Sequence, residues 1–272
     1  MTFPTNTIPL IDGDILRYEL GFAAETGWRA ITEREDAIPP FGYVEDLFQQ
    51  RLASINNILQ TEQDPIIIFT KGKTFRYDIA KRKPYKGTRK EHKPWHYNNL
   101  TVYMKHVLGA IEITHLEADD LLSVIHTALP NDTVICSRDK DLRQVPGLFY
   151  SWELGRQPSY GPILIDPIGS LQISDDNKKV SGSGLSFFYA QVLMGDSTDN
   201  IPGLPKCGPV ATMELLDGRT PDEMLEAVKG AYQDKFDNWE EELLEQGRLC
   251  WMTRRLTADG KEPVLWEIGM ME

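Results

Sequence analysis

The sequence predicts an α/β protein with a mostly parallel sheet, and two observations lead to this fold class. Short apolar runs alternate with amphipathic stretches of helical length along the first half of the chain. Strands that alternate with helices are typical of parallel sheets flanked by helices. Acidic residues directly follow several of the apolar runs. Because ligands of parallel sheets bind beyond the carboxyl ends of the strands, these acids predict a site there.

The elements of the predicted sheet follow one another regularly. Apolar runs that predict strands cover residues 8–11, 65–69, 133–136 and, more weakly, 111–113. Residues 44–59 and 118–129 repeat apolar side chains with helical period, and Pro130 ends the second of these helices. The first half of the chain therefore reads as strands connected through helices.

The second half of the chain has a different pattern. Residues 156–184 are rich in Gly, Pro, Ser and Asp, and we expect loops there with one strand at 163–165. Amphipathic or apolar helices are expected at 187–194, 221–232 and 239–255. The predicted domains are an α/β body at 1–180 and a helical portion at 181–272.

Composition narrows the class of protein. The chain has 272 residues, a net charge of −12 and three cysteines without paired spacing, which indicates neither a zinc site nor a disulfide framework. The N-terminus does not resemble a secretory signal, and no apolar run approaches the length of about 18 residues that a membrane-spanning helix needs. We expect a cytoplasmic protein without a membrane partner.

One segment carries most of the positive charge. Residues 71–106 contain eleven lysines and arginines against two acids, a net charge of +9. Such a segment suits nucleic-acid phosphates, although a solvated loop has the same composition. Tyr85, Trp95 and Tyr97 lie among these basic residues and would either stack on unpaired bases or pack a small core.

Eight carboxylates form four groups along the chain: Asp12; Glu117, Asp119 and Asp120; Asp139 and Asp141; Asp196 and Asp199. Gathered carboxylates repel one another, so we expect divalent cations to neutralise them. Oxygen ligands suit Mg²⁺ or Mn²⁺, and two such ions are typical of phosphodiester hydrolysis, which then needs no histidine base. The alternatives are an acidic helix start at residues 117–120 and a polar turn around Lys140.

Residues 195–209 form a compact Gly/Pro turn between two expected helices. Exposed backbone N–H groups and the start of the second helix, near Val210, would favour a phosphate. The alternative is a plain connection between helices.

Six motifs in a fixed order resemble the flap endonuclease and 5′–3′ exonuclease family, most closely its compact bacteriophage members. The motifs are Asp12, Phe75-Arg76, Tyr85-Lys86 with Arg89, residues 117–120, Asp139 with Asp141, and residues 195–208. They span residues 8–215, and their shared order is more specific than any one motif.

The resemblance implies a PIN-like 5′-nuclease fold with a helix–hairpin–helix turn in the helical portion. It implies one metal site built mainly from Asp12, Glu117, Asp119 and Asp120, and another built mainly from Asp139, Asp141, Asp196 and Asp199. The basic segment 71–106 would form an arch or clamp, in which Lys86 and Arg89 approach the scissile phosphate. The remaining DNA contacts would come from Arg76, Tyr85, Lys93, Gly203, Lys206 and Gly208, with K⁺ at the turn.

The implied activity is metal-dependent 5′–3′ exonuclease action on DNA with a 5′ single-stranded end. It includes 5′-flap cleavage and RNase H-type removal of primers from RNA–DNA hybrids, in phage DNA replication or degradation. The host cytoplasm would be the location, and a separate polymerase or single-strand-binding protein would be the partner.

Three positions depart from the family pattern. Thr70-Lys71 stands where the family carries an aspartate after the second strand, Lys206 replaces a glycine, and Val210 replaces a frequent lysine. The departures leave two alternatives: a PIN-like ribonuclease, which would not explain the turn at 195–208, and a catalytically weakened DNA-binding clamp.

Overall fold

The computed structural model describes residues 6–89 and 92–270, so residues 90 and 91 of the basic segment lie outside the described residues. The chain forms two compact units. Of the described residues, unit 1 contains 6–72, 92–139 and 148–163, and unit 2 contains 73–89, 140–147 and 164–270. The domain boundary expected at residue 180 falls inside unit 2, and the division into 1–180 and 181–272 stays a prediction.

A six-stranded sheet forms the centre of unit 1. Its strands lie in the order β3-β2-β1-β4-β5-β6. Their bounds are β1 Ile8–Asp12, β2 Ile66–Thr74, β3 Ile111–His115, β4 Thr133–Cys136, β5 Gly147–Ser151 and β6 Tyr160–Ile165. β1 runs parallel to β2 and to β4, and β4 runs parallel to β5. The predicted α/β class with a mostly parallel sheet is therefore confirmed.

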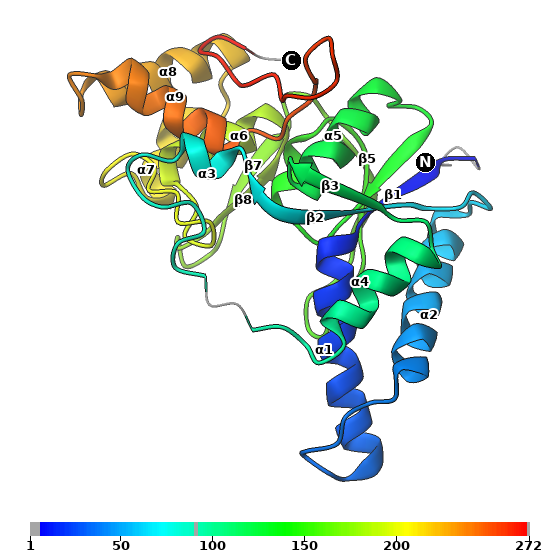
Figure 1. Ribbon diagram of the computed structural model, residues 1–272. Helices are drawn as coiled ribbons and strands as arrows, with labels where there is room; N and C mark the ends of the chain where they lie inside the picture. Colours follow the sequence, from blue (N-terminus) through cyan, green and yellow to red (C-terminus); the bar gives the residue numbers. More distant parts are fainter. Residues whose placement is uncertain (1–5, 90–91, 271–272) are drawn as a thin grey trace. The chain divides into compact units, whose positions relative to one another are not determined.

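Helices cover both faces of this sheet. α5 (Ala118–Ala128) lies on one face, and α1 (Gly13–Thr32), α2 (Phe41–Leu59) and α4 (Tyr97–His106) lie on the other (Figure 1). The core beneath the three helices contains Leu16 and Leu20 of α1 and Phe48 and Ile55 of α2, all buried. Apolar residues at helical spacing thus direct one face of each helix toward the sheet.

The strand order explains where a site can form. The chain leaves β1 toward β2 on one side, and β4 pairs with β1 on the other, so β1 lies at the switch point of the sheet. In open parallel sheets a crevice opens beyond the carboxyl ends of the strands at such a point. Asp12 ends β1 and Ser137 follows β4, which puts both at this position.

Unit 2 is mainly helical. It contains α3 (Arg76–Ile79), the 3₁₀ turn η1 (Asp141–Gln144), α6 (Gly184–Met194), α7 (Pro209–Leu216), α8 (Pro221–Gln233) and α9 (Trp239–Cys250). α6 is buried through most of its length and packs against the other three long helices. Phe188 of α6 meets Trp251 and Trp266 in an aromatic cluster at the centre of the core.

The prediction of loops over residues 156–184 is wrong in part. β6 covers Tyr160–Ile165, and β7 (Ser170–Ile173) pairs antiparallel with β8 (Val180–Ser183). The expected strand at 163–165 forms the end of β6. The hairpin was missed because each strand has only four residues, and β8, Val-Ser-Gly-Ser, contains a single apolar residue.

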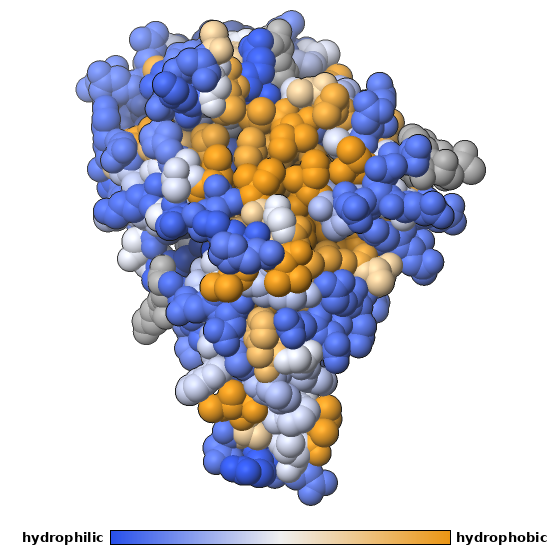
Figure 2. All heavy atoms as spheres, turned by 45° about the vertical axis from the view of Figure 1, so that its right-hand side comes forward, coloured by the Kyte–Doolittle hydropathy of each residue, from blue (hydrophilic) through white to orange (hydrophobic). Residues whose placement is uncertain are grey.

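The surface also carries exposed apolar side chains. Figure 2 shows a continuous apolar area on the face in view, flanked by hydrophilic residues. Exposed large apolar side chains of unit 1 include Val102, Val107, Ile111 and Leu129.

Within residues 6–89 and 92–270, none of the helices has the length and hydropathy to cross a membrane.

Candidate active site

Asp12 is the central acid of unit 1. It is the last residue of β1 and the N-cap of α1, where its Oδ1 accepts hydrogen bonds from the backbone N–H groups of Asp14 and Ile15 at 3.0 and 3.1 Å. The Ser137 hydroxyl donates to Asp12 Oδ2 at 2.9 Å, and the Asp139 N–H donates to Ser137 Oγ at 2.9 Å. Ser137 thus connects the end of β1 to the segment that carries Asp139. This serine was not among the predicted site residues.

Burial changes the protonation of Asp12. The side chain is 4% exposed. Burial and the neighbouring carboxylate of Asp14 raise the pKa of Asp12 to about 6, against the hydrogen bonds from Ile15, Ser137 and Asp14, which lower it. A buried carboxylate that is costly to ionise favours a cation beside it.

The start of α5 gathers three acids. Carboxylate oxygens of Glu117, Asp119 and Asp120 lie within 4.8 Å of one another, and Glu117 and Asp120 are buried. Glu117 and Asp120 also form a capping box, in which the Glu117 N–H donates to Asp120 Oδ2 at 3.2 Å. The acidic helix start and the metal-site interpretation therefore coexist. Three converging carboxylates match the oxygen donors that hard divalent cations prefer, so this group could hold a metal ion.

Thr70 connects this helix start to β2. Its hydroxyl accepts a hydrogen bond from the Ala118 N–H at 2.8 Å, and its own N–H donates to Asp14 Oδ2 at 3.0 Å. The residue that departs from the family pattern thus lies beside the acidic group of α5. Asp14 was also not singled out, although it stands two residues after Asp12 in the sequence.

The second predicted group of acids is divided between the units. Asp139 belongs to unit 1, whereas Asp141, Asp196 and Asp199 belong to unit 2. In unit 2 the Lys140 ammonium lies 3.1 Å from Asp141 Oδ1 and 2.5 Å from Asp196 Oδ2. A cation of the chain itself thus bridges two of the acids that were expected to hold an ion.

Further contacts fix these acids. The Gln191 amide donates to Asp141 Oδ1 at 2.5 Å. Asp196 Oδ1 accepts from the Thr198 N–H at 2.7 Å. Burial raises the pKa of Asp196, but the hydrogen bond and charge of Lys140 outweigh it and hold that pKa below its usual value. Burial lowers the pKa of Lys140, but Asp141 and Asp196 raise it above the ordinary lysine value.

Two residues of the basic segment are buried, which corrects their predicted contacts with DNA. Arg76 is 0% exposed, and its guanidinium donates to the carbonyls of Leu249 and Trp251 at 3.1 and 2.8 Å. Tyr85 is 3% exposed, and its hydroxyl donates to Asp199 Oδ2 at 2.8 Å. Both side chains pack and anchor the segment within unit 2.

Among the other members of the basic segment Lys86 is partly buried, whereas Arg89 and Lys93 are exposed. Lys86 Nζ lies 3.9 Å from Asp199 Oδ2, and the Lys86 N–H donates to the Asp199 carbonyl at 2.8 Å. Arg89 is exposed. In unit 1, Lys93 is exposed with its ammonium 4.8 Å from the Tyr97 ring centre, and Trp95 is 68% exposed. Of the three aromatics, Trp95 keeps the surface that base stacking needs.

The Gly/Pro turn of unit 2 divides into a buried and an exposed half. Gly203 is buried with φ +64, and its N–H donates to Gln246 Oε1 at 3.0 Å, so a DNA contact through this amide is not supported. A Cβ there would overlap the backbone nitrogen of Gly195. Lys206 and Gly208 are exposed. Lys206 has φ +64, a left-handed conformation that agrees with the glycine expected at this position.

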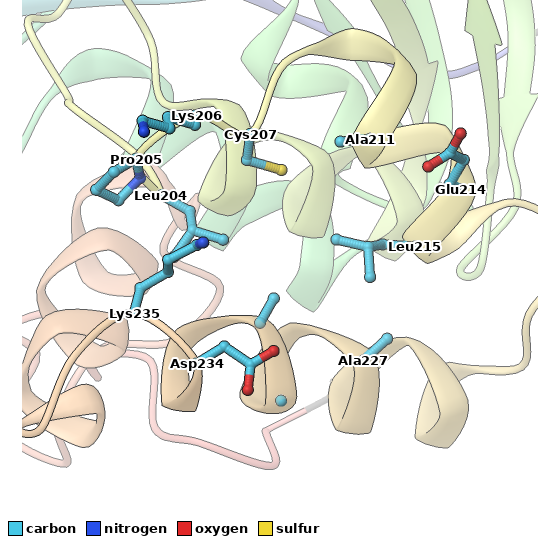
Figure 3. Close-up of a pocket in the computed structure, with 12 residues that line it drawn as sticks. Leu204, Pro205, Lys206, Cys207, Ala211, Glu214, Leu215, Ala227, Asp234 and Lys235 are labelled. Atoms are coloured by element: carbon cyan, nitrogen blue, oxygen red, sulfur yellow. The ribbon is translucent and has the colours of Figure 1, made fainter.

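A pocket of about 490 Å³ adjoins the turn (Figure 3). Its walls come from residues 204–207, from Ala211 and Leu215 of α7, and from Ala227 of α8. Lys206 and Lys235 also line it. Glu214 and Asp234 line it too, so the apolar hollow beside the turn carries two lysines and two acids.

Comparisons with known proteins agree with this geometry. No family model matches the chain. DNA polymerase I of Geobacillus stearothermophilus is 26% identical over 221 residues, which cover 78% of this chain and 23% of that protein. Flap endonuclease Xni of Shewanella halifaxensis is 28% identical over 157 residues, which cover 55% of each protein. The chain thus spans about a quarter and about half the length of these two relatives.

Solved structures have the same fold. A T5 protein co-crystallised with metal ions superposes with a TM-score of 0.54 at 16% identity, covering 90% of this chain and 89% of that one. The chain is therefore similar in sequence to a flap endonuclease and to DNA polymerase I, and it has the fold of the T5 protein.

Proposed function

We propose that this protein is a divalent-metal-dependent, structure-specific 5′ nuclease that hydrolyses phosphodiester bonds in DNA. The observation that carries the proposal is the acidic edge of unit 1. Asp12 and the segment that follows β4 meet at the switch point of the sheet, joined through Ser137. The converging acids at the start of α5 provide the oxygen ligands. The sequence similarity to a flap endonuclease supports the same reaction.

The acids of unit 1 would hold the ion. Glu117, Asp119 and Asp120 supply converging oxygens, and Asp12 supplies a buried carboxylate whose hydrogen bonds fix its orientation. Asp139, Asp141, Asp196 and Asp199 are proposed for the second ion. Two divalent ions supply an activated water and stabilise the charge that develops on the phosphate, so no histidine base is required.

The basic side chains would position DNA. Lys86 and Arg89 are proposed to face the scissile phosphate, and Lys93 a phosphate further along the strand. The buried contacts of Tyr85 with Asp199 hold the backbone from which Lys86 extends. Lys206 and Gly208 are proposed to contact duplex backbone at the exposed half of the turn, with K⁺ there.

The finer activity follows the resemblance to the flap endonuclease and 5′–3′ exonuclease family. We propose 5′–3′ exonuclease action with 5′-flap cleavage and RNase H-type primer removal, with Mg²⁺ or Mn²⁺, in phage DNA replication or degradation. DNA with a 5′ single-stranded end and RNA–DNA hybrids would be the substrates. A separate polymerase or single-strand-binding protein is the proposed partner, and the host cytoplasm the proposed location.

End-labelled substrates test the activity. Blunt duplex, 5′-flap DNA, an RNA–DNA hybrid and single-stranded RNA are digested with Mg²⁺ or with a chelator. We expect Mg²⁺-dependent products from the 5′ end of the flap substrate, and none from an Asp12→Asn variant. Cleavage of single-stranded RNA alone would instead indicate a PIN-like ribonuclease.

A second candidate is a DNA-binding clamp with weak or no catalysis. Thr70 favours it, because this position of β2 offers a hydroxyl in place of the usual carboxylate. Binding of the flap substrate without cleavage at any Mg²⁺ or Mn²⁺ concentration would support this candidate over a nuclease.

A further inference from the structure

Asp14 lies next to the acidic edge of unit 1 but is absent from the acids assigned above. It occupies the first turn of α1, directly after Asp12 and Gly13. Its side chain is 28% exposed, so part of the carboxylate reaches solvent.

Two contacts fix the Asp14 carboxylate beside Thr70 of β2. Its Oδ2 accepts the Thr70 N–H at 3.0 Å, and its Oδ1 lies 2.5 Å from Arg17 Nη2. Arg17 is itself held by the Thr70 carbonyl at 3.2 Å and the Thr101 hydroxyl at 3.2 Å. The orientation of Asp14 is thus set by three different segments of unit 1.

Thr70 also links Asp14 to the start of α5, which carries the acidic group. The same residue that donates its N–H to Asp14 accepts the Ala118 N–H with its hydroxyl at 2.8 Å. Ala118 follows Glu117 and begins the helix that carries Asp119 and Asp120. Two consecutive hydrogen bonds through one residue therefore connect Asp14 to the start of the acidic group.

We propose that Asp14 supplies a further carboxylate to the metal site of unit 1, beside the position in β2 that offers only the Thr70 hydroxyl. This inference rests on the proposed metal-dependent function. Carboxylates around a metal site commonly orient its ligands or its bound water, and their loss typically weakens metal binding about 10- to 100-fold. Thr70 carries no charge, so the negative charge at this position comes from Asp14 in the first turn of α1.

Mn²⁺ binding to the purified, full-length protein tests the proposal, measured by calorimetry and by the paramagnetic resonance of free Mn²⁺. Glu117→Gln identifies the binding event that belongs to unit 1. We expect Asp14→Asn to weaken that event about tenfold or more. We expect Asp14→Asn with Thr70→Asp to restore it, because an aspartate at residue 70 can still accept the Ala118 N–H while returning a carboxylate to this position of β2.

Arg17→Gln separates ligation from packing. If Asp14 acts only through its ion pair with Arg17, Arg17→Gln should weaken Mn²⁺ binding as Asp14→Asn does, and Thr70→Asp should rescue nothing. If Asp14 serves the ion, Arg17→Gln should keep or strengthen binding, since a competing cation is removed. Circular dichroism identifies any variant that does not fold, and the Thr70 rescue then decides alone.

The outcomes distinguish this inference from the proposed function. Wild-type protein that binds no Mn²⁺ through Glu117 would overturn the metal-dependent function itself. Wild-type protein that binds Mn²⁺ while Asp14→Asn binds it equally well would overturn only the role of Asp14. Failure of the Thr70→Asp rescue in a folded protein would also overturn it.

Discussion

The buried carboxylate of Asp12 predicts an unusual dependence of stability on pH in the metal-free protein. Its pKa is about 6 in the folded chain and 3.8 as an ordinary value. A folded-state pKa that is raised means that stability is lost as the pH rises from the unfolded to the folded value. At about 1.36 kcal/mol per pKa unit, ionisation of Asp12 should cost about 3 kcal/mol at neutral pH. About 1 kcal/mol of this cost is already present at pH 4.5, so about 2 kcal/mol should appear between pH 4.5 and 7.5.

Asp12→Asn removes this cost without changing the shape of the side chain. Urea unfolding in a chelator, at pH 4.5 and 7.5, gives the free energy of unfolding of the variant relative to wild type. We expect that difference to shift in favour of Asp12→Asn by about 2 kcal/mol on going to pH 7.5. The loss of hydrogen bonds from Asp14, Ile15 and Ser137 to the neutral carboxyl cancels between the two pH values, and their extra strength to the ionised carboxylate is already contained in the pKa of Asp12.

Divalent ions should reverse the effect. Mg²⁺ or Mn²⁺ that binds beside Asp12 stabilises the ionised form, so saturating ion should return wild type to or above the stability of Asp12→Asn at pH 7.5. Asp132→Asn, at an exposed residue of unit 1, controls for the loss of one negative charge. Equal pH profiles for wild type and Asp12→Asn in chelator would refute the reasoning from burial.

Three further predictions concern binding and catalysis. Lys86→Ala should lower the single-turnover rate at saturating enzyme by about a hundredfold, whereas Lys93→Ala should reduce affinity and its salt dependence by about one ion; equal behaviour of both variants would contradict the catalytic role of Lys86. Gly208→Ala should fold and lose about 1 kcal/mol of stability or less, since its φ is −97° and no atom lies within 4 Å of the added methyl, while alanine is a poorer N-cap of α7 than glycine. It should weaken duplex binding about fivefold if a phosphate approaches that backbone; unchanged affinity would exclude the contact. Lys140→Met should lower metal-free stability by about 1 kcal/mol and strengthen Mn²⁺ binding to unit 2 in calorimetry, and weaker binding would contradict competition between lysine and ion.

Hydrophobic periodicity predicted those strands and helices whose buried face can be recognised within their own sequence. β1, β2, β4, α2 and α5 were found because apolar residues recur at the spacing of their own element. α1 was not predicted, although its buried residues Leu16, Leu20 and Ala24 also recur at helical spacing. The β7–β8 hairpin lacks such a signal, because cross-strand pairing rather than side-chain pattern defines it.

Arg76, a predicted DNA contact, is buried through interactions with residues that are distant in the sequence. Arg76 and Lys86 stand in the same basic segment, and composition cannot tell which of them turns inward. Arg76 is fixed by carbonyls of Leu249 and Trp251, more than 170 positions away along the chain. A buried guanidinium requires several such acceptors, and their convergence depends on the packing of α3 against α9.

The charge balance of the acidic groups also depends on contacts between residues that are distant in the sequence. In the sequence, Lys140 lies between Asp139 and Asp141, and local spacing suggests a turn with its own counter-ion. In the structure its ammonium also reaches Asp196, 56 positions later, and neutralises part of a group that a count of carboxylates assigns wholly to metal ions. An ion at Asp141 and Asp196 must share those oxygens with Lys140 or displace it. The affinity of each group for metal therefore depends on the cations that the fold brings to it, as well as on its number of acids.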